Sequence, residues 1–288
     1  MHGRVIATQQ LTPSLVRVEL GEGDLASFTM PEATDAYVNV ALPPAGAPYD
    51  AVFDPREVKA EHPEDSWPAR RRYTVRSWDP SARRLVVDFV VHGDVGVAGP
   101  WASAVQPGGV LVFEGPSGGY RPDPDADWHL LVGDESALPA IAASLEVLPP
   151  GAPAVVRLLC DGPDHELPLP SPGSVDLQWL HRAGGPGDAD LLPDAVRTLD
   201  FRHGRVHAFV HGEADEIRAI RRHLLTERGL GRADMSCSPY WRRTMTDEAW
   251  RQVKRDYVAA MEAEVAQVYT TPPGAVTIAW GTSAGSRS

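Results

Sequence analysis

The segment 71–79 reads RRYTVRSWD and combines cations, one phenol and one hydroxyl in a single alternating run. Valine, tyrosine and threonine favour extended backbone, and side chains two positions apart share one face of a strand. A flat aromatic, a short hydroxyl and flanking guanidinium groups suit a ligand with a planar ring and a phosphate tail. An ordinary half-exposed strand with solvated arginines explains the same run equally well. One face would carry Tyr73 and Val75, and the other Arg72, Thr74 and Arg76.

Short alternating runs separated by turn residues extend from Val5 to Gly115. No long helical pattern interrupts them, which is typical of an antiparallel barrel or sandwich. The segment 43–68 is rich in Pro, Ala and charge, and we expect a long surface loop there with room for a short helical turn. Besides the strand at 71–78, strands are expected at 15–20, 37–42, 85–91 and 110–114.

The hydrophobic period changes after Pro122. The apolar run 128–132 predicts a buried strand, and apolar residues at 138, 141, 145 and 148 predict a helix with Ser136 as its N-cap. Alternating strands and helices predict a parallel sheet with a ligand crevice at the carboxyl ends of its strands. We therefore expect two domains, 1–122 and 123–288, divided near the Pro/Asp-rich segment 121–127. Further strands are expected at 154–159, 175–180 and 206–210, and helices at 188–199 and 215–228.

A long amphipathic helix is expected from Asp247 to Tyr269, with its apolar stripe packed on the core. A short strand at 275–280 and a Gly/Ser-rich end should follow. The stripe consists of Trp250, Val253, Tyr257, Met261, Val265 and Val268.

The 288 residues include 27 Lys+Arg and 39 Asp+Glu, a formal charge of -12. This charge repels nucleic-acid phosphates and anionic membranes, so we expect neither nucleic-acid binding nor membrane insertion. The N-terminus lacks the apolar run of a signal peptide, and no run reaches the roughly 18 apolar residues of a membrane span. A soluble, cytoplasmic protein is expected. Cys160 and Cys237 lack zinc-ligand spacing and should be reduced thiols, and the histidines show no metal-binding pattern.

Several turns contain small residues that allow a ligand to approach the backbone closely. Residues 88–93 (DFVVHG) form a strand that ends in His-Gly, and residues 96–102 (GVAGPWA) could open a short helix. A third such turn, 115–120 (GPSGGY), ends the first half. Residues 132–140 (VGDESALPA) place a helix N-terminus after a strand, the arrangement of a nucleotide site, but without the GxGxxG or GxxxxGKST patterns. Their acids would oppose a bare phosphate, so this turn is expected to face a ring or sugar, or to gate the crevice.

Taken together and in order, these motifs resemble the siderophore-interacting proteins, FAD-containing ferric-siderophore reductases of the ferredoxin-reductase-like superfamily. The resemblance implies an N-terminal Greek-key β-barrel that binds FAD and a C-terminal α/β domain of the NAD(P)H-binding type. It also implies that electrons pass from NADH, NADPH or a ferredoxin through FAD to Fe(III) in a siderophore, which releases Fe(II). The motifs that carry it are RRYTVR (71–76), DFVVHG (88–93), GVAGPWA (96–102), GPSG (115–118), VGDESALPAI (132–141), HGEA (211–214) and YWR (240–242).

The resemblance assigns roles by position. Tyr73 would pack on the flavin ring and Thr74 would hydrogen-bond near its reactive nitrogen, so these two are the expected catalytic residues. From charge alone, an acidic protein must offset its own field to bind an anionic ferric siderophore, and the expected contacts are Arg76, Arg242, Arg243 and Lys254. The expected FAD contacts are Arg71, Tyr73, Thr74, Val75, Arg76, Val91, His92, Gly93, Gly96, Ala98, Gly99, Trp101, Ala102, Asp134 and Ser136. The family pattern usually has Pro at Val97, Ser at Gly99 and Gly at Pro239, and these departures bear on the phosphate and nicotinamide contacts.

Two alternatives remain open. A general flavin or ferric-chelate reductase would use the same fold and cofactor on a substrate other than a siderophore. A non-catalytic siderophore carrier would do without FAD, and the missing hydroxyl at Gly99 favours it.

Overall fold

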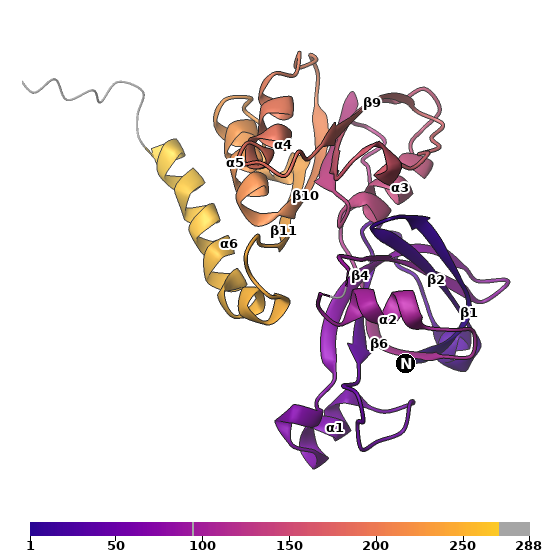
Figure 1. The fold of residues 1–288 in the computed structure, drawn as a ribbon. Helices are drawn as coiled ribbons and strands as arrows, with labels where there is room; N and C mark the ends of the chain where they lie inside the picture. The colour runs from indigo at the N-terminus through magenta and orange to yellow at the C-terminus, as the bar shows by residue number, and fades with distance from the viewer. Residues whose placement is uncertain (94, 271–288) are drawn as a thin grey trace, which may run out of the picture.

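The chain folds as an N-terminal barrel and a C-terminal α/β half that lie one above the other (Figure 1). The computed structural model describes residues 1–93 and 95–270, with side chains described up to residue 264. The strand expected at 275–280 lies outside the described residues.

The barrel closes from antiparallel strands in the order β1-β2-β5-β4-β3-β6. Spatial neighbours such as β2 and β5 are not consecutive in the chain, so the connectivity is that of a Greek key, as expected. Inward-facing side chains such as Val18, Val38 and Phe89 fill its core. The strands are β1 (His2–Thr12), β2 (Leu15–Gly21), β3 (Tyr37–Leu42), β4 (Ala69–Asp79), β5 (Arg84–Val90) and β6 (Val110–Ser117).

Two short helices accompany the barrel. α1 (Pro55–Glu61) is the helical turn expected within the 43–68 loop, and it begins where the Asp54 side chain accepts a hydrogen bond from the Arg56 amide. α2 (Ala98–Ala104) covers the barrel, with Ala98 and Ala102 in the core. Single turns of 3₁₀ helix lie at Gly23–Ser27, Glu64–Ser66, Pro163–His165 and Arg232–Asp234.

The second half is a five-stranded parallel sheet in the order β11-β10-β7-β8-β9. Its fully buried strands read as continuous apolar runs, which is why the sequence predicted them. α4 and α5 pack on one face of the sheet, and α3 lies between the other face and the barrel (Figure 1). The elements are β7 (Trp128–Asp134), α3 (Leu138–Glu146), β8 (Pro153–Cys160), β9 (Ser174–His181), α4 (Asp188–Arg197), β10 (Val206–Glu213), α5 (Ala214–Thr226) and β11 (Met235–Trp241).

A shared apolar cluster joins the two halves. Leu15 and Tyr120 from the barrel side are buried together with Leu138 and Ile141 of α3 and Phe209 of β10. Burial of such side chains stabilises the contact by roughly 1.5–3 kcal/mol each. The interface therefore holds the barrel and the sheet in a defined relation, and it positions the site between them.

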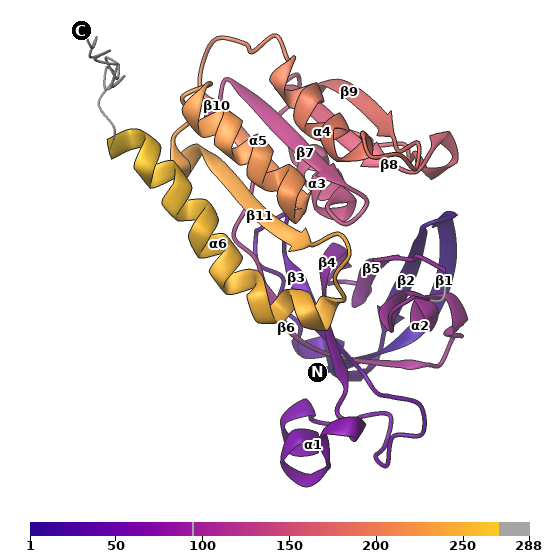
Figure 2. The same cartoon turned by 60° about the vertical axis from the view of Figure 1, so that its left-hand side comes forward.

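The C-terminal helix α6 (Asp247–Thr270) runs beside β11 and reaches the barrel with its N-terminal end (Figure 2). Trp250, Tyr257 and Met261 are buried as expected, but Val253 is 39% exposed. The expectation for Val253 was wrong because α6 packs on α5 and on the edge strand β11 alone among the elements it contacts most, which leaves a narrower buried stripe. The side chains of Val265 and Val268 lie outside the described part.

None of the described helices is both long and apolar enough to cross a membrane.

Candidate functional site

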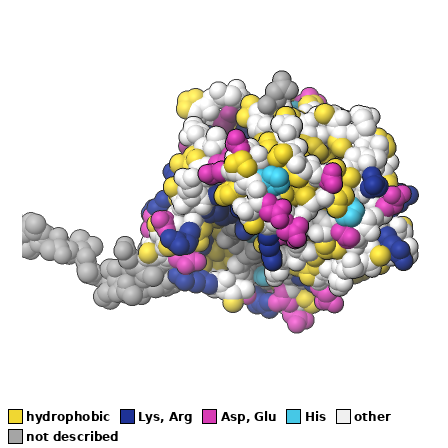
Figure 3. Space-filling view, turned by 90° about the horizontal axis from the view of Figure 1, so that it is seen from below, with side chains coloured by type: hydrophobic (Ala, Val, Ile, Leu, Met, Phe, Trp, Pro, Cys, Tyr) yellow, Lys and Arg dark blue, Asp and Glu magenta, His cyan; other side chains and the backbone are white. Residues whose placement is uncertain are grey.

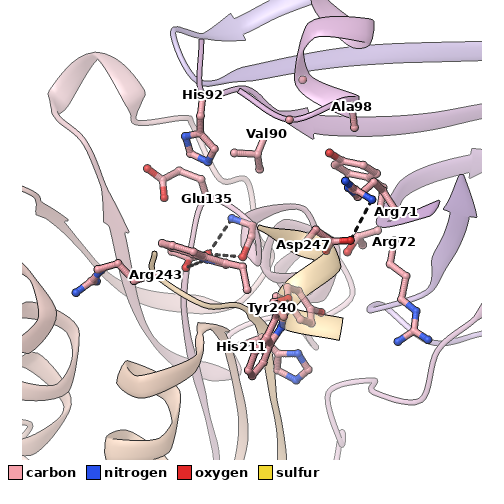
Figure 4. Close-up of a pocket in the computed structure, with 18 of the residues that line it drawn as sticks. Arg71, Arg72, Val90, His92, Ala98, Glu135, His211, Tyr240, Arg243 and Asp247 are labelled. Carbon is pink, nitrogen blue, oxygen red and sulfur yellow. Dashed lines mark hydrogen bonds and ion pairs between the residues drawn. The ribbon is translucent and has the colours of Figure 1, made fainter. Parts of the chain in front are cut away.

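A cleft of about 1460 Å³ lies between the two halves. β4 and the turn before α2 form its barrel wall, the carboxyl ends of the parallel strands form its sheet wall, and α6 closes one side (Figure 4). Pockets for one small ligand measure roughly 300–1,000 Å³, so this cleft has room for more than one ligand group. Figure 3 shows Lys and Arg side chains around a hollow on this side of the molecule, with Asp and Glu among them.

β4 places Tyr73 and Thr74 in the cleft wall. The Tyr73 ring packs on Phe89 of the barrel core with centroids 4.3 Å apart, and burial raises the pKa of its phenol well above the ordinary value. The Thr74 hydroxyl, only 7% exposed, hydrogen-bonds the phenol of Tyr240 at the end of β11. One aromatic and one hydroxyl from the barrel therefore meet a phenol from the sheet.

A β-bulge moves Arg76 out of the cleft. The pairing of β4 with β5 shifts register between Val75 and Ser77, so the alternation expected from the sequence breaks at Arg76. Arg76 instead forms an ion pair with Glu146 of α3, and Val75 is buried in the barrel core. Neither side chain lines the cleft.

Arg71 lines the cleft but is already paired. Its guanidinium contacts Asp247 (Nη1 to Oδ2, 3.1 Å) and also Glu248, both in the first turn of α6 (Figure 4). These acids are 176 and 177 positions away in the sequence, and local pattern gives no sign of the contact. A phosphate bound at Arg71 would compete with them.

α6 also supplies cations to the cleft. Arg251, Lys254 and Arg255 line it together with Arg72 of β4. Burial and then the neighbouring charge of Arg72 lower the pKa of Lys254 to about 8. Asp247 and Glu248 are the acids that pair with Arg71, and five basic side chains against these two acids leave the group with a net positive charge. We call Arg71, Arg72, Arg251, Lys254 and Arg255 the basic cluster.

The glycine-rich turn lies against the barrel side of the cleft. Gly96 has a φ of +81° with open space where a Cβ would be, and the N-cap of α2, Val97, makes no side-chain hydrogen bond. Among the described residues no side chain caps α2, so its first amides, at Ala98 and Gly99, could serve a ligand. His92 lines the cleft near Glu135 (Figure 4).

Asp134 occupies the turn between β7 and α3. Its Oδ1 accepts hydrogen bonds from the amide and hydroxyl of Ser136, and its Oδ2 accepts from the Glu213 amide (3.0 Å) and Trp241 Nε1 (2.8 Å). Ser136 is therefore not the N-cap that the sequence predicted: the N-cap is Ala137, and the Ser136 hydroxyl donates to Asp134 instead. The carboxylate ties the ends of β7, β10 and β11 together.

At the next strand ends, an arginine bridges two acids. Arg182, after β9, binds Glu135 through both nitrogens (2.6 and 2.9 Å) and Asp161, after β8, at 2.8 Å. Glu135 is 6% exposed, and burial raises the pKa of its carboxyl. All three side chains line the cleft.

His211 lies where β10 ends, next to Tyr240 (Figure 4). Its ring stacks on Phe209, and Nε2 lies 2.9 Å from the Ser236 hydroxyl. Burial lowers the pKa of His211 to about 3, so the ring is neutral at pH 7. Nδ1 is buried and has no hydrogen-bond partner among the described residues.

The two arginines that follow β11 point in different directions. Arg243 lines the cleft, and it contacts Glu216 of α5 through its side chain and Glu213 through its amide. Arg242 turns away to Asp215 (3.5 Å) and the ring of Tyr257. Only Arg243 of this pair is therefore placed to touch a ligand in the cleft.

The cleft thus brings together part of the expected set. The expected residues that line it are Arg71, Tyr73, Thr74, His92, Gly96, Ala98, Gly99, Asp134, Ser136, Arg243 and Lys254. Those outside its lining are Val75, Arg76, Val91, Gly93, Trp101, Ala102 and Arg242; most of these pack on the barrel core or form ion pairs. Asp161, Arg182 and His211 also line the cleft and were not predicted as site residues, although each follows an expected strand, which is a usable signal.

Two family models match the chain. One, described as the siderophore-interacting FAD-binding domain, covers residues 4–120, and one, described as siderophore-interacting protein, covers residues 126–244. An uncharacterised protein of Mycobacterium tuberculosis is 40% identical over 271 residues, 89% of this chain and 95% of that protein. Ferric vibriobactin reductase ViuB of Vibrio cholerae is 32% identical over 253 residues, 86% of this chain and 91% of that protein. A siderophore utilization protein from T. fusca has a solved structure with a TM-score of 0.74 and 36% identity, over 86% of this chain and 94% of that one.

Proposed function

The chain belongs to the siderophore-interacting protein family, and on this basis we propose that it is an FAD-dependent ferric-siderophore reductase that takes electrons from NADH or NADPH. The observation that carries the proposal is the single cleft that joins Tyr73 and Thr74 of the barrel to the carboxyl ends of the parallel strands. A ring held on the barrel and a nucleotide held on the sheet would meet there. The iron of the siderophore is the substrate.

The residues present fit FAD. Tyr73 offers an aromatic wall, Thr74 a hydroxyl, and the turn at Gly96 an open backbone in front of the first amides of α2. The volume of about 1460 Å³ accommodates a dinucleotide and leaves room for a second ligand. Arg71 is the expected phosphate contact, and it would have to exchange its α6 acids for the phosphate.

When bound, FAD supplies the conversion of a two-electron donor into single electrons, which no side chain performs. The chain's own residues orient and shield it. Tyr73 and Phe89 form a rigid apolar wall, and the Thr74 hydroxyl, held by Tyr240, presents a polar atom at a defined position. We assign no acid, base or nucleophile, because electron transfer to iron requires none.

The basic cluster suits an anionic ferric siderophore. It concentrates positive charge in the cleft of a protein whose formal charge is -12. Opposite charge raises the local concentration of the ligand and its association rate. Reduction lowers the charge of iron from +3 to +2 and weakens its attraction to anionic oxygen ligands, which favours release. Arg243 is a further contact, whereas the positions of Arg76 and Arg242 make them weaker candidates.

The test is a visible absorption spectrum of the purified protein, followed by anaerobic addition of NADH or NADPH and then of a ferric siderophore with an Fe(II) chelator. Flavin bands that bleach with a nucleotide and return with the ferric siderophore, while the chelator reports Fe(II), support the proposal. Thr74→Ala should slow bleaching and leave FAD content unchanged. Ser77→Ala, an exposed hydroxyl on the same strand, is the matched control.

Other outcomes select the alternatives. Equal turnover of simple ferric chelates would make the protein a general ferric reductase. A protein that takes up no FAD but binds the ferric siderophore would be a carrier, an outcome for which Gly99 and the pairing of Arg71 with α6 are the favouring observations. If reduced ferredoxin bleaches the flavin bands and pyridine nucleotides do not, the electron donor is a ferredoxin. We place the reaction in the cytoplasm, where reduced nucleotides and reduced thiols such as Cys160 and Cys237 are maintained.

A further inference from the structure

The cleft extends from the barrel wall along the ends of the parallel strands. His211 lies at the end of β10, Asp134 and Glu135 at the end of β7, Asp161 after β8 and Arg182 after β9. The strand order places β10, β7 and β8 side by side. In sheets of this kind a dinucleotide lies across the carboxyl ends of the strands.

Arg182 directs both of its terminal nitrogens at acids. Both terminal nitrogens bind Glu135, at 2.6 and 2.9 Å, and Nη1 also binds Asp161 at 2.8 Å. Glu135 is 6% exposed and Arg182 retains 18% of its side-chain exposure. Two carboxylates and one guanidinium leave this end of the cleft with a net negative charge.

We propose that the Glu135–Arg182–Asp161 triad selects NADH over NADPH, with Asp161 receiving the adenosine ribose. This inference rests on the proposed function and names its electron donor. Asp161 is 48% exposed, and its Oδ2 has no hydrogen-bond partner in the described part of the chain. A carboxylate at the end of the second strand is the group that accepts hydrogen bonds from a ribose 2′-hydroxyl.

Space beside the triad suits a sugar and base. Gly184 and Gly185 line the same part of the cleft, and a Cβ added at either would meet nothing within 4 Å. Gly184 has a φ of +77°, which suits glycine. The backbone there leaves the Asp161 carboxylate accessible.

The 2′-phosphate of NADPH would meet the net negative charge of the triad. It needs a pair of arginine donors with no competing acid, and the Nη1–Nη2 pair of Arg182 could supply them only by leaving Glu135. That exchange would strand a buried carboxylate without its partner, which is strongly unfavourable. Like charges brought together across a binding site also oppose association.

His211 lies at the opposite end of the cleft, next to the barrel wall. His211 is 3% exposed, and its buried Nδ1 lacks a partner among the described residues. Buried polar atoms are nearly always hydrogen-bonded. His211 lies beside Tyr240, which contacts Thr74, so the nicotinamide end of the nucleotide would lie next to the flavin wall.

The experiment measures Kd for NADH and for NADPH by calorimetric titration of the FAD-loaded protein, independently of turnover. We expect the wild type to bind NADH at least about tenfold more tightly, because the triad repels the added phosphate. The double variant E135Q/D161N frees Arg182 and should reverse the preference. Asp164→Asn is the matched control, since it removes an acid of the same loop that does not line the cleft.

Each result is decisive. Equal or tighter NADPH binding by the wild type overturns the inference while leaving NAD(P)H-dependent reduction intact. An Asp164→Asn protein that shifts the preference as far as E135Q/D161N shows a general charge effect and also overturns it. Binding of neither nucleotide to a flavin-loaded protein removes the proposed donor and the inference together. The wild-type ratio alone keeps the test valid if the double variant does not fold.

Discussion

Asp134→Asn should destabilise the α/β half, although it replaces only one carboxylate oxygen by an NH₂ group. The carboxylate is 1% exposed and accepts four hydrogen bonds, two on each oxygen. An asparagine must turn its NH₂ toward one of these pairs of donors. In the better orientation the Ser136 hydroxyl rotates to accept, and the Ser136 amide loses its partner.

The loss in the free energy of unfolding can be worked out from the four hydrogen bonds that Asp134 accepts. One lost charge-assisted bond costs about 1.5–3 kcal/mol, and the two bonds from the Glu213 amide and the Trp241 indole each weaken by about 1 kcal/mol when the acceptor becomes neutral. Removing the charge also relieves repulsion of Glu135 and Glu216, whose carboxyl pKa values Asp134 helps to raise. The balance is a net loss of about 3 kcal/mol in the free energy of unfolding.

Urea unfolding followed by far-UV circular dichroism and tryptophan fluorescence measures this loss. Ser136→Ala is the control, because it removes one hydroxyl donor and should cost only about 1 kcal/mol. Combining Asp134→Asn with Trp241→Phe gives the coupling across the 2.8 Å bond to the indole. A loss no greater than that of Ser136→Ala would refute the view that this carboxylate ties the three strand ends together.

Three further outcomes can be checked. Burial and nearby acids raise the pKa of Glu216 from 4.5 to about 8, so the folded state holds this proton more tightly than the unfolded state. The free energy of unfolding should therefore fall as the pH rises from 4.5 to 8. In urea titrations, Glu216→Gln should leave the free energy of unfolding nearly unchanged at acid pH and raise it by at most about 5 kcal/mol at pH 8. Gly133→Ala puts a Cβ 2.5 Å from that of Ala137 and should lower stability by about 3 kcal/mol, seen as a lower Tm. Lys254→Met should weaken binding of an anionic ferric siderophore about tenfold, and binding should depend less on salt than in the wild type. The affinity of the wild type should fall as the pH rises through about 8, where Lys254 loses its charge. Lys59→Met, which changes the other lysine, should alter neither the affinity nor its salt dependence.

The local sequence pattern was sufficient to predict strands whose apolar residues alternate or follow one another within a few positions. β4, β7 and β8 were predicted because their side chains alternate or form continuous apolar runs. β1 and β11 were missed because β1 is largely polar and β11 contains Pro239 and serines at the edge of the sheet. β11 is an edge strand, which buries less than a central strand, and its identity depends on its partner strand.

The sequence by itself determined the two-part architecture, the strand that carries Tyr73 and Thr74, and the family, because each rests on the identity and order of residues close along the chain. Tertiary structure decided which side chains share the cleft. The bulge removed Arg76, α6 brought Asp247 to Arg71 and Lys254 to the cleft, and Arg182 reached Glu135 from 47 positions away. Charges pair by distance in space, and closure of the sheet against the barrel sets those distances; no periodicity along the chain encodes them.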